Sequence, residues 1–162
     1  MAKIKLICDS TSDLSEEMYE ELGADVLRLK VNFGQDSFVD GKTIDIDRLY
    51  NLVEERKILP KTSACSIAEF QDVFAKYFSE GYQIIFVSIS SEFSSNFNNA
   101  LVAASTFEGH ENDFRGLDSR SLSSGIGLQL FKIKEDIDQG FSLEEVYSRA
   151  LDRVDRVNAE FV

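Results

Sequence analysis

The recurring order of strand, polar loop and helix restricts the fold of this sequence more than any other feature. Short apolar runs predict strands at residues 3–8, 24–29, 83–87 and 114–117, and amphipathic helical patterns separate most of them. The run at 83–87 is almost continuously apolar, which is typical of a central strand covered on both faces. The order predicts an α/β fold with a mostly parallel sheet and helices on both faces.

The helical segments show apolar residues at spacings of three and four, and polar residues at their starts. We expect Asp13 to cap the first helix, with Glu16 as its capping-box partner. The remaining helices are expected over residues 45–56, 66–78, 97–104, 122–137 and 142–154. Residues 31–39 should be extended with a turn at Gly34, and residues 61–65 should form a loop.

The length of 162 residues and an apolar fraction of 43% suffice for one domain with a substantial core. We expect residues 1–157 to form a single α/β ligand-binding domain. Residues 158–162 end in an apolar pair, which indicates the beginning of another strand. We therefore expect residues 158–162 to be the start of a second domain that this sequence does not include.

The charge balance limits the partners of the chain. It has 29 acidic and 17 basic residues and a net charge of −12, which disfavours nucleic-acid binding because that needs a basic surface. No apolar run approaches the ~20 residues of a membrane-spanning helix, and the N-terminus lacks a signal-peptide pattern. We expect a cytoplasmic protein without membrane insertion. Cys8 and Cys65 are expected to be buried thiols, with a disulfide between them as the alternative.

Three predicted strands end in loops rich in hydroxyl groups, at residues 9–13, 88–96 and 118–124. In a parallel sheet these loops lie at one edge, where ligands bind, and residues 62–63 are expected to join them. Helix N-termini at this edge favour anions. The same residue types also serve as ordinary helix caps, so capping remains an alternative role for each of them. The pattern indicates a small anionic ligand held by hydroxyl and backbone groups.

Catalytic and metal-binding patterns are weak in this sequence. The single histidine, His110, lies in a polar turn, and neither a G-x-S-x-G elbow nor a phosphate-binding loop is present. The glycines at 125 and 127 are half of a dinucleotide fingerprint, and close helix packing explains them better. Pairs of histidine or cysteine that could bind a metal are lacking. We expect a protein that is not an enzyme and that uses neither a cofactor nor a metal.

One enzymatic alternative remains open at the end of the first strand. Asp9 could act as a nucleophilic aspartate of a phosphatase-like hydrolase built on a similar sheet. Such hydrolases carry a second aspartate two residues later, where this sequence has Thr11.

Six short motifs follow one another along the chain in a specific order. They are DSTSDL at residues 9–14, FVDG at 38–41, PKTS at 60–63, ISSEFS at 89–94, DSRS at 118–121 and GIG at 125–127. In this order and spacing the chain resembles the N-terminal domain of the DegV family, which are bacterial fatty-acid-binding proteins.

The resemblance implies a long-chain fatty acid whose carboxylate is held by hydroxyls matching Thr62 and Ser94. Five further polar residues would lie around these two: Ser10, Ser63, Ser91, Ser95 and Asn96. It also implies that the loaded protein is presented to a fatty acid kinase, which makes an acyl phosphate for phospholipid synthesis. The chain would then be a carrier and not the catalyst.

Two loops depart from the family pattern. Ala64-Cys65-Ser66 stands where the family usually has glutamine, proline and serine, and Ser95-Asn96 stands where it prefers glycine and threonine. Glycine allows a close backbone approach that Ser95 would partly block. An alternative interpretation is that the chain is an interaction module without ligand, which forms a homodimer through an exposed apolar face.

Overall fold

A four-stranded parallel sheet forms the centre of the structure, a computed structural model that describes residues 3–160. The strand order is β2-β1-β6-β7, and β6 lies between β1 and β7. The strands are β1 (Lys3–Asp9), β2 (Asp25–Leu27), β6 (Tyr82–Ser88) and β7 (Phe114–Asp118). Residues 84–87 of β6 are completely buried, which confirms the prediction of a central strand covered on both faces.

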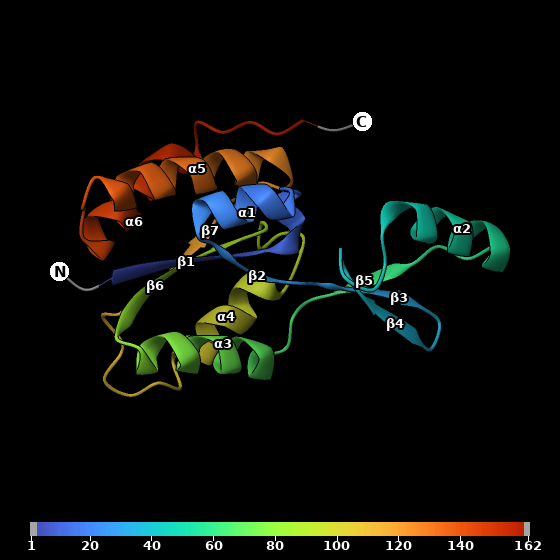
Figure 1. Cartoon of the computed structure of the whole chain (residues 1–162), viewed down its shortest axis with the longest axis horizontal. Coiled ribbons are helices and arrows are strands. Elements are labelled where there is room, and N and C mark those ends of the chain that lie inside the picture. Colours follow the sequence, from blue (N-terminus) through green and yellow to red (C-terminus); the bar gives the residue numbers. More distant parts are fainter. Residues whose placement is uncertain (1–2, 161–162) are drawn as a thin grey trace.

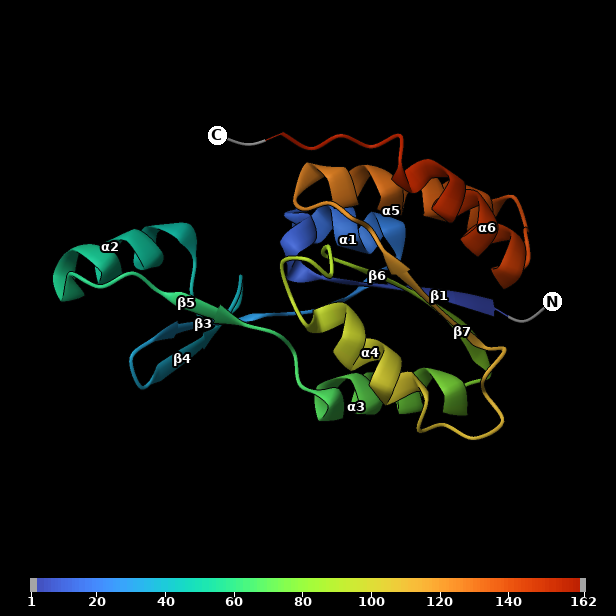
Figure 2. The same ribbon diagram turned by 180° about the vertical axis from the view of Figure 1, so that it is seen from behind.

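Helices cover both faces of this sheet, as the sequence predicted (Figures 1 and 2). One face carries α1 (Glu16–Leu22), α5 (Ser124–Asp138) and α6 (Leu143–Val154), and the other carries α3 (Ile67–Ser79) and α4 (Asn96–Ala104). Successive strand residues point to opposite faces. Ile85 and Val87 therefore join the core beneath α5 and α6, whereas Ile84 and Phe86 join the aromatic core beneath α3.

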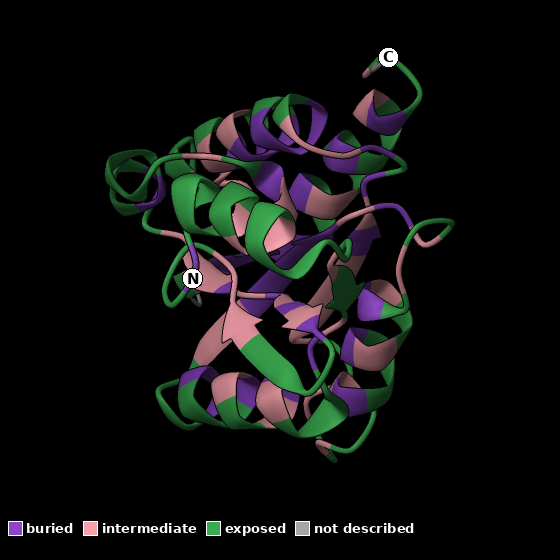
Figure 3. Cartoon of the chain, turned by 90° about the vertical axis from the view of Figure 1, so that its right-hand side faces the viewer, coloured by how far each residue is buried: buried purple, intermediate pink, exposed green. Residues whose placement is uncertain are grey.

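The parallel sheet and the helices on its two faces make up the main domain. A small lobe lies beside it (Figures 1 and 2). It comprises β3 (Lys30–Phe33), β4 (Asp36–Val39), α2 (Ile46–Arg56) and β5 (Lys61–Ser63). The three strands form an antiparallel sheet in the order β4-β3-β5, and Gly34 supplies the expected turn with φ of 62°. The buried part of its core consists of Val31, Phe33 and Ile44. Figure 3, which looks onto this side, shows that most of the buried residues lie in the main domain.

The prediction of a loop over residues 61–65 was wrong for its first three residues. Residues 61–63 form β5, in which Thr62 lies opposite Val31 and Ser63 lies opposite Lys30. All three residues of β5 are exposed and polar. No apolar alternation marks such a strand, because its pairing with β3 comes from backbone hydrogen bonds and one polar side-chain contact, between Asn32 and Ser63.

The first helix begins later than the sequence predicted. Ser15 caps α1, and its Oγ accepts from the backbone N–H of Met18 at 3.3 Å. Asp13 instead ends a short 3₁₀ turn over Ser10–Ser12 in a left-handed conformation, with φ of 52°. The predicted capping role of Asp13 is therefore wrong, because the extra turn moves the helix start by two residues. The capping boxes at the starts of α3 and α6 are formed, with Ser66 and Ser142 as the caps.

The C-terminal residues 158–160 have no regular secondary structure, and residues 161–162 lie outside the described part of the chain. Residues 158–160 run along the outside of α5 (Figure 1). The boundary between a domain at 1–157 and a further domain from 158 stays a prediction.

Candidate functional site

Asp9, the last residue of β1, is fully buried and joins the loops at the carboxyl edge of the sheet. Its Oδ2 accepts hydrogen bonds from Ser88 Oγ at 3.1 Å, Ile89 N at 2.9 Å and Asn96 Nδ2 at 2.9 Å. Its Oδ1 accepts from both the backbone N–H and the hydroxyl of Thr11, at 3.2 and 2.5 Å. Five donors therefore surround this carboxylate. A nucleophilic aspartate needs an accessible oxygen, so the geometry gives no support to the phosphatase-like alternative.

Ser94 is half-buried and lies two residues before the start of α4, on the main domain. Its Oγ accepts from the backbone N–H of Asn96 at 3.1 Å. Ser95, at the N-cap position of α4, is exposed and makes no capping hydrogen bond with its side chain. The first turn of a helix leaves N–H groups without intrahelical acceptors. The start of α4 therefore combines the Ser94 hydroxyl with helix N–H donors that the Ser95 side chain does not cap.

Thr62 lies on the small lobe and its side chain is exposed. The chain reaches the main domain three residues later, where the N–H of Cys65 donates to Asn96 Oδ1 at 3.0 Å and Asn99 Nδ2 donates to the carbonyl of Cys65 at 2.8 Å. An extended chain covers roughly 10 Å over three residues, which bounds the distance from Thr62 to this anchor. Thr62 on the small lobe therefore lies within this reach of a residue anchored to α4, the helix that Ser94 precedes on the main domain.

The residues expected around this pair have mainly structural contacts. Ser10 is buried and its Oγ accepts from the backbone N–H of Leu29 at 3.2 Å. Ser63 is exposed and its Oγ accepts from Asn32 Nδ2 at 3.1 Å. The N–H of Ser91 donates to the carboxylate that ends β7, at 3.2 Å. Both ends of the buried Asn96 amide are used within the protein, toward Asp9 and Cys65.

A cavity of about 1010 Å³ lies between the loop after β1 and the start of α2. Its lining from the small lobe includes Ile44, Ile46 and Leu49, and its lining from the main domain includes Ser10 and Leu14. Sequence reasoning missed this cavity, because it assigned no lobe to residues 30–63. Ile46, which lines the cavity, is 73% exposed at the start of α2, and this exposure is visible only in the structure.

The single histidine has structural partners. His110 stacks on the ring of Phe78, with centroids 4.4 Å apart, and its Nδ1 lies 3.0 Å from Asp113 Oδ2. Within residues 3–160, no three histidine, cysteine or acidic side chains gather as metal ligands do. None of the described helices is long and apolar enough to cross a membrane.

Both cysteines are buried free thiols, as predicted, and the alternative of a disulfide is wrong. Burial raises the pKa of Cys8 and of Cys65 to about 12. The glycines of α5 support the packing interpretation. A Cβ on Gly127 would lie 3.0 Å from Leu14 Cδ2, and a Cβ on Gly125 would lie 2.0 Å from Ser121 Oγ.

The fold and its hydroxyl-bearing edge define an α/β domain that presents polar groups at the carboxyl ends of parallel strands. A family model described as "Uncharacterised protein, DegV family" matches residues 3–162. A DegV domain-containing protein of Clostridium perfringens is 35% identical over 152 residues, which are 94% of this chain and 54% of the relative. The chain belongs to the DegV family.

Solved structures extend the comparison to the fold and its ligands. A structure described as fatty acid binding of a DegV family protein from Thermus thermophilus matches with a TM-score of 0.85 and 30% identity, covering 95% of this chain and 54% of the other. A stearic acid-binding protein from Eubacterium ventriosum matches with a TM-score of 0.80 and 28% identity, covering 96% and 52%. This chain spans about half the length of the relatives that it matches.

Proposed function

We propose that this chain holds the carboxylate of a long-chain fatty acid, with the hydroxyls of Thr62 and Ser94 as donors. The observation that supports the proposal is the anchoring of Cys65, three residues after Thr62, to the start of α4, which Ser94 precedes. Ser94 Oγ accepts a hydrogen bond from Asn96 N, and neither its proton nor the Thr62 hydroxyl has a partner among the described residues. The fatty-acid ligands named for the related structures support the same ligand class.

The proposal extends to a carrier role in the cytoplasm, in which the loaded protein presents its fatty acid to a fatty acid kinase. The fatty acid then becomes an acyl phosphate for phospholipid synthesis, and the chemistry belongs to the kinase. Two features support a carrier that is not itself an enzyme. The carboxylate of Asp9 is enclosed by donors, and His110 is occupied by Phe78 and Asp113.

The direct test is titration of the purified chain with a fluorescent long-chain fatty acid. Replacing both Thr62 and Ser94 by alanine should weaken binding by about 2–5 kcal/mol, counting about 1–3 kcal/mol for each charge-assisted hydrogen bond. Ser37→Ala removes an exposed hydroxyl from β4 of the same lobe and should leave the affinity unchanged. Equal affinity of the double variant and the wild type would remove Thr62 and Ser94 from the site, and a wild type that binds no fatty acid would refute the proposal.

A second candidate function, an interaction module that forms a homodimer, is favoured by exposed apolar side chains near α2. Ile46, Tyr50 and Leu59 are 73%, 65% and 80% exposed. Exposed apolar groups that lie together mark interaction surfaces. Light scattering over a range of concentrations distinguishes the two. A dimer that Ile46→Ser and Tyr50→Ser together convert to a monomer supports this candidate, and a wild-type monomer at all concentrations rejects it.

A further inference from the structure

The two proposed carboxylate donors lie on different lobes, so the orientation of the small lobe sets the distance between them. Thr62 belongs to β5 of the small lobe, and Ser94 precedes α4 of the main domain. The base of the lobe is held by the Cys65 contacts with α4 and by an ion pair between Lys30 and Glu69. These contacts fix where the lobe joins the main domain. The tilt of the lobe against the main domain depends on contacts farther from the base.

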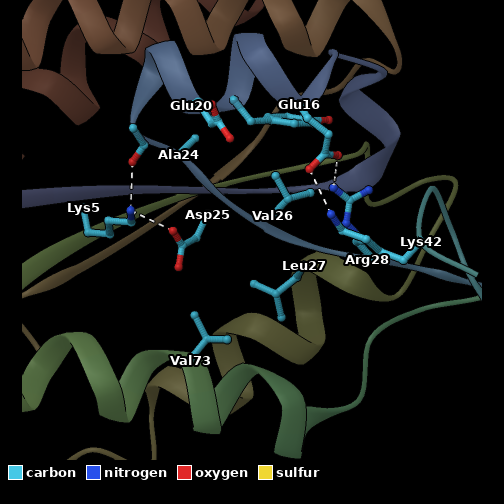
Figure 4. Close-up of a pocket in the computed structure, with 12 residues that line it drawn as sticks. Lys5, Glu16, Glu20, Ala24, Asp25, Val26, Leu27, Arg28, Lys42 and Val73 are labelled. Atoms are coloured by element: carbon cyan, nitrogen blue, oxygen red, sulfur yellow. Dashed lines mark hydrogen bonds and ion pairs between the residues drawn. The ribbon is translucent and has the colours of Figure 1, made fainter.

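One cluster of charged side chains makes such a contact, and Figure 4 shows it beside a cavity of about 460 Å³. Glu16, at the start of α1, accepts from Arg28 through Oε1 and forms an ion pair with Lys42 through Oε2 at 2.9 Å. Arg28 lies between β2 and β3, and Lys42 lies in the turn after β4. We call these three residues the Glu16 cluster. It joins a main-domain helix to the turn of the small lobe.

The backbone of the turn supports the same contact. Arg28 Nη1 donates to the carbonyl of Asp40 at 3.2 Å, and the Arg28 side chain is 12% exposed. Gly41 follows with φ of 66°, and a Cβ at this position would lie 2.7 Å from Arg28 Nη1. Glycine therefore allows the turn to lie directly over the guanidinium group. The turn, the guanidinium and the α1 carboxylate form one continuous link.

We propose that the Glu16 cluster holds the small lobe in the orientation that brings Thr62 to the ligand carboxylate beside Ser94. Glu16 is thus a positioning residue, which acts on the ligand through the lobe and does not touch it. This inference rests on the proposed function. It adds a residue that contributes to affinity from outside the ligand site.

The expected effect follows from a population argument. A ligand that binds only one orientation has an affinity reduced by the fraction of molecules in that orientation. Glu16 and Lys42 are 55% and 53% exposed, and exposed ion pairs are individually weak. Loss of the cluster should therefore lower the affinity by about two- to fivefold. Reversal of the Glu16 charge adds repulsion from two cations and should lower it by about tenfold.

Charge reversal with rescue tests this role. Glu16→Lys should weaken fatty-acid binding, and Glu16→Lys combined with Lys42→Glu should restore most of it. Glu21→Lys makes the same charge change at an exposed position of the same helix and should bind as the wild type does. If Glu16→Lys weakened binding only by destabilising the fold, Lys42→Glu would not restore the affinity. Equal affinities of the wild type and Glu16→Lys, or a failure of the double variant to recover, would overturn the proposal.

A second measurement needs no ligand. Spin labels at Tyr50→Cys on α2 and Leu128→Cys on α5, which are 65% and 63% exposed in the wild type, report the distance between the lobes. The buried native thiols should stay unlabelled. The distance distribution should broaden with Glu16→Lys and narrow again with the added Lys42→Glu. An unchanged distribution would overturn the proposal. If the distribution responds but the wild type binds no fatty acid, the orienting role stands and the fatty-acid function fails.

Discussion

At the scale of single residues, the buried carboxylate of Asp9 should make a large contribution to stability. Asp9→Asn replaces one carboxylate oxygen by an amide donor that faces other donors. Loss of charge-assisted hydrogen bonds, together with one unsatisfied buried group, should lower the free energy of unfolding by about 2–4 kcal/mol. Urea unfolding measures this loss. Thr11→Val removes only one donor and should lower it by about 1 kcal/mol. Equal urea midpoints for Asp9→Asn and the wild type would contradict the structural role.

The two thiols should be unreactive in the folded protein. Burial raises the pKa of Cys8 and Cys65 from the ordinary value of 9.0 to about 12. At pH 8 the reactive thiolate is then only ~10⁻⁴ of each thiol. A disulfide exchange reagent should modify neither thiol until urea unfolds the chain, whereas an added exposed cysteine at Ser37 should react at once. Rapid modification of the native wild type would contradict the burial.

The same shifts give the thiols a pH-dependent effect on stability. Their pKa is higher in the folded than in the unfolded state, so the folded state retains protons that the unfolded state loses. The contribution is fully present below pH 9 and is lost as the pH rises from 9 toward 12. The midpoint of urea unfolding should therefore fall across this range. The double variant Cys8→Ser, Cys65→Ser should show a smaller fall.

The polar loops could be predicted from the sequence, but the roles of the individual residues within them could not. The motif at 9–14 marks the end of a strand, and a ligand role and a capping role use the same residue types. Asn96 was expected near the ligand, and the structure shows its amide used between Asp9 and Cys65. Such partners come from segments more than 30 residues apart, which one sequence does not relate to each other.

At the scale of elements, a buried carboxylate joins α5 to α6. Asp136 is 3% exposed and accepts from Arg149 Nε at 2.8 Å and from Arg153 Nη2 at 2.5 Å. Asp136→Asn should lower the free energy of unfolding by about 1–3 kcal/mol, because both guanidinium groups lose their charged acceptor. Asp138→Asn, on the same helix, breaks only an exposed pair with Lys134 and should cost about 0.5 kcal/mol or less. Equal unfolding midpoints for the two variants would contradict this account.

The elements with their own apolar pattern were predicted well. The helix over 66–78 and the strand over 83–87 were found close to their observed bounds, because both bury apolar side chains at a regular period. The short strand β5 was missed, because its three residues are exposed and polar. The start of α1 was misplaced, because Asp13 and Ser15 are equally good caps by residue type.

At the scale of the whole molecule, the two lobes should differ in local stability. The core of the small lobe has only three buried apolar side chains, whereas the main domain has two large clusters of buried apolar side chains. Regions with few buried contacts open without global unfolding. Amide hydrogen exchange in β3 and β5 should therefore proceed at a free energy about 2 kcal/mol or more below that of β1 and β6. Equal protection of the two sheets would show that the lobes unfold together.

The arrangement of the lobes was beyond the reach of the sequence. The α/β order predicted the main domain, including helices on both faces of a parallel sheet. The extended segment over 31–39 and the helix over 45–56 were also predicted, but not their association into a separate antiparallel lobe. That association depends on the pairing of β3 with β5, which lie about 30 residues apart in sequence.

Because Lys30 pairs with Ser63, the small lobe is an insertion that could be deleted from the fold. Neighbouring strands lie about 5 Å apart, so the chain leaves the main domain and returns to it at nearly the same point. A turn of about two residues spans such a gap. A gene that joins residue 30 to residue 63 through this turn would encode a shortened protein with the parallel sheet and its covering helices intact. The same geometry would let lobes of other lengths replace this one without disturbing the rest of the fold.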